Sequence, residues 1–200
     1  MTMLLWPDLK DDIEKLLLTK LDPNGRRGLF FGLRAHPIHE ICKACGKQVD
    51  IPGDRKCPNC GVACPVRNPL IQYHSGQDIP KPLGTPICLP WPGTISKQWF
   101  DPKVKDGGYG GGNSIVVRHT EGPMYTTGYC HQFAFAGLVI GQTYPAGTEI
   151  GRVGTTGDST GPHLHFTCRK LIEGKSTLVD PFPELLAACG ICEIPWHEVG

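Results

Sequence analysis

Residues 157–166 read GDSTGPHLHF, a turn-rich segment that leads into two histidines separated by one leucine. Side chains alternate between the two faces of an extended strand, so His163 and His165 share one face and Leu164 lies on the other. Two neighbouring imidazoles can bind a metal, but such pairs also occur in half-buried strands that have no site. Ligands elsewhere in the chain have to decide between these two interpretations.

The composition is that of an ordinary globular chain with many turns. The 200 residues include 26 glycines and 19 prolines, which favours short strands joined by turns over a helical bundle. The 20 basic and 19 acidic side chains nearly cancel, so overall charge predicts neither a nucleic-acid partner nor an anionic membrane surface. No run of about 18 apolar residues occurs, and we expect no membrane insertion. The sequence therefore predicts a mainly β fold.

The first 20 residues predict an amphipathic helix and no signal peptide. They lack a basic start, a sustained apolar stretch and a small-residue cleavage site. Asp8 can cap a helix with Leu9, Ile13, Leu16 and Leu17 on one face, which ends at LDPNG. We expect this helix to pack on its own domain, with docking to a partner as the alternative.

Two C-x-x-C pairs lie within CKACGKQVDIPGDRKCPNC at residues 42–60. This spacing resembles a zinc ribbon, in which two knuckles supply four thiolates to one metal. Cys42, Cys45, Cys57 and Cys60 would form a closed tetrahedral site, so its zinc would be structural. Two disulfides are the alternative if the mature protein leaves a reducing compartment. Because the basic residues here are scattered without aromatic partners, an assembly role is favoured at least as much as nucleic-acid binding.

The remaining cysteines have weaker interpretations. Cys64 is a fifth thiol near the two pairs and has no predicted role. Three others are interpreted as small buried apolar side chains: Cys88, Cys130 and Cys168. Cys189 and Cys192 form a third C-x-x-C pair, and free thiols, a disulfide and metal ligands all remain open for it.

The segment GGYGGGN at 107–113 is not a dinucleotide-binding fingerprint. A G-x-G-x-x-G pattern that starts at Gly108 needs a third glycine at position 113, where Asn113 stands, and no helix follows. The next residues, SIVVRH, are β-branched and typical of a strand. We expect the glycines to form a loop at a sheet edge or groove wall.

Three more positions offer ligand or catalytic side chains. His74 and Asp78 lie four residues apart in YHSGQDIP, and His131 lies in GYCHQF. Taken alone, each is more often a surface or structural side chain than a functional one.

Together these segments resemble the lysostaphin-type zinc metallopeptidases, also called LytM-type endopeptidases. The shared pattern is H-x-G-x-D at 74–78, Tyr129-x-His131, and H-x-H at 163–165. The likeness covers residues 70–185 and includes these further segments: GTPI at 84–87, YGGGNSIVV at 109–117, AGTEIGRVGTTGDSTGPHLHF at 146–166 and VDP at 179–181.

The resemblance implies a compact antiparallel β-sandwich with a groove and one catalytic zinc. It implies His74, Asp78 and His165 as zinc ligands, a set that leaves one coordination position for the water that hydrolysis requires. It implies His131 and His163 as the unliganded catalytic pair. We assign the general base to His163 and the orientation of water or stabilisation of the oxyanion to His131, with an exchange of these roles as the alternative.

Three further positions bear on the pocket. His119 could face the same cleft from behind the ligands. Gln132 and Thr167 depart from the family pattern, which often has leucine and glutamate there. These departures leave the shape of the pocket rim open and do not affect the metal chemistry.

The expected organisation has four parts. Residues 1–33 form the helix and a linker, 34–66 the zinc-ribbon-like module, 67–186 the metallopeptidase domain and 187–200 a C-terminal tail.

The implied function is zinc-dependent peptidoglycan endopeptidase activity on peptide stems or crossbridges of the bacterial cell wall. Because no signal peptide is expected and the substrate lies outside the cytoplasmic membrane, we favour a lysin in a bacteriophage tail, with tail proteins as partners. The alternatives are an endolysin held in the host cytoplasm before lysis, a catalytically silent tail or assembly protein, and a zinc-ribbon nucleic-acid protein. Near-neutral charge argues against the last of these.

Overall fold

The computed structural model describes residues 5–6, 8–21, 32–66, 69–99 and 110–188. The elements along these parts of the chain are α1 (Leu9–Leu21), β1 (Gly32–Ile41), β2 (Gln48–Val49), β3 (Pro69–His74), β4 (Gln77–Pro80), β5 (Pro86–Cys88), β6 (Gly93–Trp99), β7 (Ser114–Arg118), β8 (Thr126–Cys130), β9 (Ala134–Phe135), β10 (Thr143–Tyr144), β11 (Glu149–Arg152), β12 (His163–Ile172), β13 (Lys175–Val179) and α2 (Phe182–Ala188).

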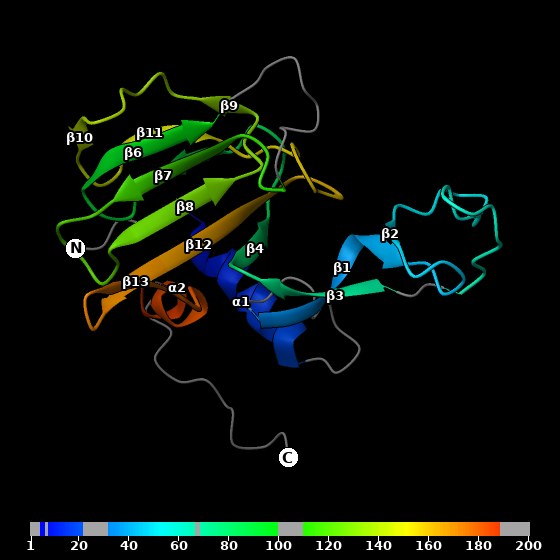
Figure 1. The fold of residues 1–200 in the computed structure, drawn as a ribbon. Helices are drawn as coiled ribbons and strands as arrows, with labels where there is room; N and C mark the ends of the chain where they lie inside the picture. The colour runs from blue at the N-terminus through cyan, green and yellow to red at the C-terminus, as the bar shows by residue number, and fades with distance from the viewer. Residues whose placement is uncertain (1–4, 7, 22–31, 67–68, 100–109, 189–200) are drawn as a thin grey trace.

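A seven-stranded antiparallel sheet is the framework of the fold. Its strand order is β10-β6-β7-β8-β12-β13, and β4 also pairs with β12. The long strand β12 pairs with β8 along one edge. Its other edge pairs first with β4 and then with β13. Figure 1 shows β8 and β12 side by side across this sheet. Residues from distant parts of the chain therefore meet along β12.

A second, smaller sheet completes a single core. Its order is β5-β11-β9, and all its pairings are antiparallel. Ile87 of β5 and Ile150 of β11 belong to the same buried cluster as Ile95 of β6 and Ile115 of β7. Two sheets that share one apolar core are the arrangement of a sandwich. The prediction of a mainly β, antiparallel fold is confirmed.

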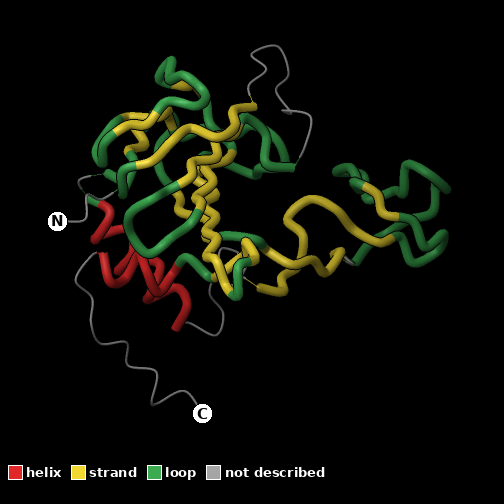
Figure 2. Tube along the Cα trace, turned by 60° about the vertical axis from the view of Figure 1, so that its left-hand side comes forward, coloured by secondary structure: helices red, strands yellow, loops and turns green. Residues whose placement is uncertain are grey.

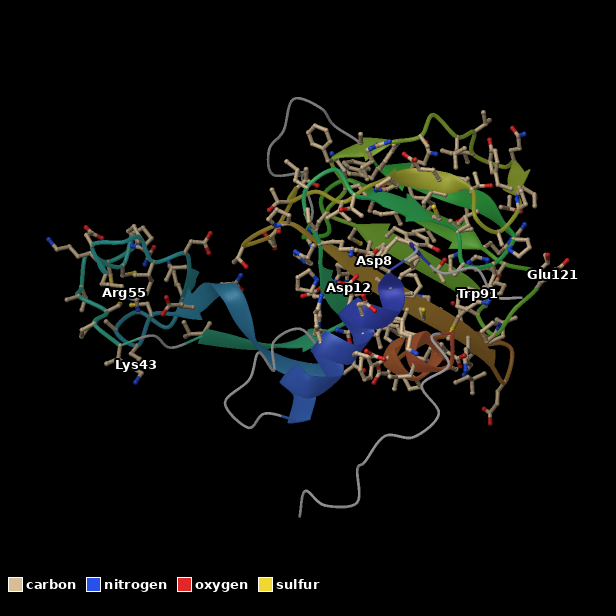
Figure 3. The ribbon with its side chains drawn as sticks, turned by 180° about the vertical axis from the view of Figure 1, so that it is seen from behind. Asp8, Asp12, Lys43, Arg55, Trp91 and Glu121 are labelled. Carbon is tan, nitrogen blue, oxygen red and sulfur yellow. The ribbon has the colours of Figure 1, made fainter. Side chains whose placement is uncertain are left out.

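The N-terminal helix packs on its own domain, as predicted. Leu9 and Ile13 of α1 are fully buried in the main core, and α1 lies beside α2. Lys81, next to the end of β4, lies 2.8 Å from an oxygen of Asp12 and also contacts Asp8. Figure 3 shows both aspartates at the start of α1. The predicted side-chain contacts of Leu16 and Leu17 lie outside the described part of the structure.

The cysteine-rich module stands on a two-stranded ribbon. β1 pairs antiparallel with β3, and β2 pairs with the far end of β1. Figures 1 and 2 show the module extending away from the main sheets on this ribbon. At the base of the ribbon, Gly32 pairs with His74. The predicted division of the chain into four parts stays a prediction, and the tail from residue 189, with Cys189 and Cys192, lies outside the described residues, as do residues 107–109 of the glycine segment.

No described helix combines the length and the apolar character that crossing a membrane requires.

If α1 is part of the core, truncating its buried face must destabilise the whole domain. We expect Leu9→Ala to lower the free energy of unfolding by about 2–5 kcal/mol, because it leaves a cavity in the core. Glu14→Ala, on the exposed face of the same helix, should change it by less than about 0.5 kcal/mol. Urea denaturation followed by tryptophan fluorescence measures both. Equal stability of the two variants would show that α1 is a detachable appendage.

Candidate metal centre and active site

Strand register brings the predicted ligands together. His165 lies opposite Asp78 in the β12–β4 ladder. His74 ends β3 and is joined to β4 by the short connection at Ser75 and Gly76. Directly opposed residues in an antiparallel pair have Cβ atoms about 5 Å apart. The ladder itself therefore places Asp78 beside His165, and the connection brings His74 to both.

Three donor atoms form a small triangle. His165 Nδ1 lies 2.7 Å from Asp78 Oδ1. His74 Nε2 lies 3.1 Å from the same oxygen and 3.0 Å from His165 Nδ1. All three side chains are buried. The structure thus unites the three residues that the resemblance implies as zinc ligands.

Hydrogen bonds alone cannot satisfy this triangle while Asp78 is ionised, which is the form that its low pKa favours. If both imidazole nitrogens donate to Asp78, their two N–H groups face each other across 3.0 Å. If either nitrogen lacks its proton, its lone pair faces the carboxylate lone pair at 3.1 Å or less. A cation about 2 Å from each atom accepts all three lone pairs at once. The donor set therefore fits a metal, and two histidines with one carboxylate are a set found in catalytic zinc sites.

The charge states favour metal binding as well. Burial raises the pKa of Asp78, but hydrogen bonds with His165 and His74 outweigh burial and hold this pKa far below its usual range. Burial lowers the pKa of His165. An ionised carboxylate and a neutral imidazole are the forms that bind metals. The second ring nitrogen of His165 lies 3.3 Å from the Ser75 hydroxyl, which holds the ring orientation.

Two more imidazoles lie beside the triangle. The His131 ring is 4.6 Å from the His163 ring and 5.8 Å from the His165 ring, between centroids. His163 Nε2 lies 3.5 Å from Asp78 Oδ1. These are the two residues implied as the catalytic pair.

Backbone carbonyls determine which nitrogen of each ring carries the proton. His131 Nδ1 donates to the Thr156 carbonyl at 2.6 Å, and His163 Nδ1 donates to the Gly161 carbonyl at 2.8 Å. Because a carbonyl oxygen only accepts, each neutral ring has its proton on Nδ1 and a lone pair on Nε2. Both rings are therefore prepared to accept a proton at Nε2.

His131 is held neutral in an uncommon backbone conformation. Burial lowers its pKa to about 3, and the neighbouring His163 ring acts in the same direction. Its φ is 61°, in the left-handed region that residues other than glycine rarely adopt. The His131 N–H donates to the Gly111 carbonyl at 2.8 Å, which helps to hold this conformation. Such strain is typical of functional positions.

The sequence raised three further residues as possible neighbours of the pocket: His119, Gln132 and Thr167. His119 lies away from the site, because its ring bonds to the Pro92 carbonyl and the Thr127 hydroxyl and its N–H pairs with Tyr125, just before β8. His131 follows the opposite end of β8, so His119 does not face the cleft.

The structure decides the open question about Gln132. Gln132 has no exposed surface, and its amide donates to the Tyr129 carbonyl, so it lies inside the fold and not on the pocket rim. Thr167 is half-buried and shares the face of β12 that carries His163 and His165.

Sequence reasoning missed the role of Thr156. Its carbonyl binds His131, and its hydroxyl accepts the Asn113 N–H at 3.0 Å and donates to the Gln132 carbonyl at 3.2 Å. The role of a backbone carbonyl cannot be recognised from the residue type, because every residue has a carbonyl. Only the glycine-rich approach in GDSTGPHLHF and the preceding threonines pointed to this loop.

The four predicted thiols of the module also meet. The Sγ atoms of Cys42 and Cys60 are 3.8 Å apart, those of Cys45 and Cys57 are 3.9 Å apart, and all four lie within 4.8 Å of one another. Four sulfurs at about 2.3 Å from one ion in a tetrahedron are about 3.8 Å apart. The set therefore fits zinc, whereas a disulfide requires about 2.0 Å. The eight described cysteines are all free thiols.

Two matching turns build this thiol set. The Gly46 N–H donates to the Cys42 carbonyl at 2.7 Å, and the Gly61 N–H donates to the Cys57 carbonyl at 2.8 Å. Both glycines have a φ of 70°, which explains why a glycine follows each pair. The backbone N–H of Cys45 lowers the pKa of Cys42 to about 6, against the effect of burial. The thiolate that a metal needs is thus favoured.

The family follows from a match to known proteins. Residues 72–181 match the model of Peptidase family M23, which is more than half of the chain and contains all five site residues. The chain belongs to peptidase family M23. The module at 42–64 precedes the residues matched to the family.

Similar proteins share this region. The DD-carboxypeptidase/endopeptidase Mpg of Neisseria meningitidis is 39% identical over 124 residues, covering 58% of this chain and 25% of that protein. The peptidoglycan DD-endopeptidase ShyA of Vibrio cholerae is 34% identical over 96 residues, covering 48% and 20%. The solved structure of the antimicrobial peptidase lysostaphin from Staphylococcus simulans has 29% identity and a TM-score of 0.48, covering 64% of this chain and 49% of that one. The chain matches no more than a quarter of the length of the first two relatives.

A substitution of Gly76, which lies between His74 and Asp78, tests the geometry of the triangle. A Cβ at Gly76 would lie 2.4 Å from the Phe166 carbonyl oxygen and 3.0 Å from His165 Nε2. Gly76→Ala should therefore displace His165 and weaken metal binding at this site by at least about 10-fold. Titration calorimetry with zinc measures the change. Gly53→Ala is the control, because nothing lies within 4 Å of its added carbon. Parental affinity in Gly76→Ala would contradict the assigned geometry.

Proposed function

We propose that this chain is a zinc-dependent endopeptidase that cleaves peptide bonds of bacterial peptidoglycan. The observation that carries the proposal is the buried triangle of His74, Asp78 and His165 with two Nδ1-protonated imidazoles beside it. Family membership supports peptide hydrolysis. The names of two relatives, a DD-carboxypeptidase/endopeptidase and a peptidoglycan DD-endopeptidase, support cell-wall peptide as the substrate class.

The three ligands would hold the zinc, which when bound lowers the pKa of a water molecule and polarises the carbonyl to be cleaved. The chain's own contribution is proton transfer. His163 presents the Nε2 lone pair 3.5 Å from Asp78, at the edge of the ligand set, and would accept a proton from the attacking water. Once protonated, the same nitrogen can deliver that proton to the leaving amine.

His131 would orient the reacting groups. Its Nε2 also begins as an acceptor, because its Nδ1 proton is bound to the Thr156 carbonyl. A second fixed acceptor beside His163 would align the attacking water through its other hydrogen. The low pKa of His131 keeps it in this acceptor form at neutral pH.

A structural zinc in the module is the second part of the proposal. Cys42, Cys45, Cys57 and Cys60 would form a closed site that folds the module and takes no part in hydrolysis. The support is the tetrahedral sulfur spacing and the pair of matching glycine turns.

A bacteriophage tail is the setting that we propose. It is supported by the module, which lies outside the residues matched to the family and extends from the body on a ribbon, as an assembly element would. A catalytically silent tail protein is disfavoured, because all five site residues are in place. The N-terminal helix α1 adds no support for a tail setting, because its apolar face is buried in the core of this same chain.

Substitutions of the two histidines on one face of β12 should separate metal binding from proton transfer. His165→Ala should abolish cell-wall clearing in zymograms and remove one of two zinc ions per chain. His163→Ala should keep both ions but lower the rate by about 10²–10⁴-fold, because only the proton acceptor is lost. Metal content measured by mass spectrometry accompanies each assay. Equal clearing by His165→Ala and the parent would exclude this site.

The tail assignment has its own test. Mass spectrometry of purified virions should detect the protein in a fixed ratio to tail proteins. Detection only in lysates, with none in virions, would replace the tail lysin with an endolysin.

A further inference from the structure

Cys64 is a fifth thiol in contact with the four that are proposed to bind zinc. Its Sγ donates toward the Cys42 Sγ across 3.9 Å and also lies 3.6 Å from the Val62 carbonyl oxygen. Cys42 has no exposed surface, whereas Cys60, on the other side of the set, is exposed. A thiol outside the set of four therefore contacts a fully buried member of the set.

The position of Cys64 is fixed by its backbone. The Cys64 N–H donates to the Arg55 carbonyl at 2.6 Å, and Arg55 Nε donates back to the Cys64 carbonyl at 2.9 Å. The Arg55 guanidinium also binds both oxygens of the buried Glu40 carboxylate, at 2.7 and 3.1 Å. Glu40 belongs to β1, two residues before Cys42. Arg55, labelled within the module in Figure 3, thus ties Cys64 to the strand that leads into Cys42.

A hydrogen bond to Cys42 would help to compensate the negative charge of a four-thiolate site. Four thiolates around one divalent cation leave two negative charges to be compensated by donors around the sulfurs. Backbone N–H groups of Ala44 and Cys45 already point to Cys42. Because a thiolate is a stronger acceptor than a neutral carbonyl, the Cys64 proton should turn to Cys42 and not to Val62 when the site is loaded.

Cys64 also lines a cavity of about 450 Å³ in the module. The cavity lining includes Cys64, Val62 and Val66 but not Cys42.

We propose that Cys64 is a positioning residue of the module's metal site, whose S–H hydrogen bond stabilises the metal-bound Cys42 thiolate and slows release of the ion. The inference rests on the proposed structural zinc site. It assigns no coordination bond to Cys64, which lies outside the group whose donor atoms are all within 4.8 Å of one another.

Zinc transfer to a chromogenic chelator tests the proposal in the full chain. His165→Ala serves as the parent, so that of the two sites proposed among the described residues only the module's remains. Cys64→Val fills the same space but has no donor, and Cys64→Ser keeps a donor. We expect release about 10-fold faster or more from Cys64→Val, and within about threefold of the parent from Cys64→Ser. Cys88→Val, at a half-buried cysteine of β5, is the control and should match the parent.

Replacement of the zinc by cobalt provides a second test, read from the absorption spectrum. Cys64→Val should shift the thiolate-to-cobalt charge-transfer band while its intensity remains that of four thiolates. A fall to three thiolates would make Cys64 a ligand and overturn the proposal. Release from Cys64→Val at the parental rate, or from Cys64→Ser as fast as from Cys64→Val, would also overturn it, because the donor would then be irrelevant. A parent chain that holds no metal would instead refute the structural zinc site, and the role of Cys64 with it.

Discussion

The opposition of Asp78 and His165 in the β4–β12 ladder is the constraint on which the site depends. Side chains alternate along a strand, so a slip of one residue in β4 would replace Asp78 by Ile79 on the site face and send the carboxylate into the core. The core prevents this slip, because Ile79 and Leu164 are both fully buried beside the site residues. Apolar burial on one face of the ladder therefore enforces the metal geometry on the other face. Asp78 and His165 therefore need no loop to hold them, and His74 is joined to β4 by the two residues Ser75 and Gly76.

This arrangement concentrates strain and polar groups in one place. Three ligand atoms lie within 3.1 Å of one another, and with Asp78 ionised no placement of protons on the two imidazoles satisfies all three. His131 keeps a left-handed backbone, and Gly76 leaves no room for a side chain. The first two features cost free energy in the metal-free protein, and a bound cation offsets the first of them. The surrounding sandwich is thus a scaffold whose stability maintains an unfavourable local geometry that suits a metal.

The sequence was most informative where chemistry resides in side chains with a fixed local spacing. H-x-H requires only the two-residue period of a strand, and the C-x-x-C pairs with their glycines follow from one turn type, so both could be predicted locally. The failures concern long-range placement. His119 lies near Thr127, at the start of β8, and His131 just past its end, a distinction that depends on the pairing of β7 with β8 and not on the residues. The carbonyl of Thr156 could not be predicted, because every residue has one.

The module could be inserted beside the catalytic residues because antiparallel pairing keeps its two ends together. Gly32 and His74 lie opposite each other, so the chain leaves and re-enters the body at one point. Such an insertion raises the entropic cost of closing the chain between its two ends, but it does not separate the strands of the core. The module is held by its own contacts, the thiol set and the Arg55–Glu40 pair. The triangle of His74, Asp78 and His165 is held by the pairing of β12 with β4. The thiol set and the triangle of His74, Asp78 and His165 thus depend on different parts of the fold. A change in the thiol set would leave in place the ladder that carries Asp78 and His165.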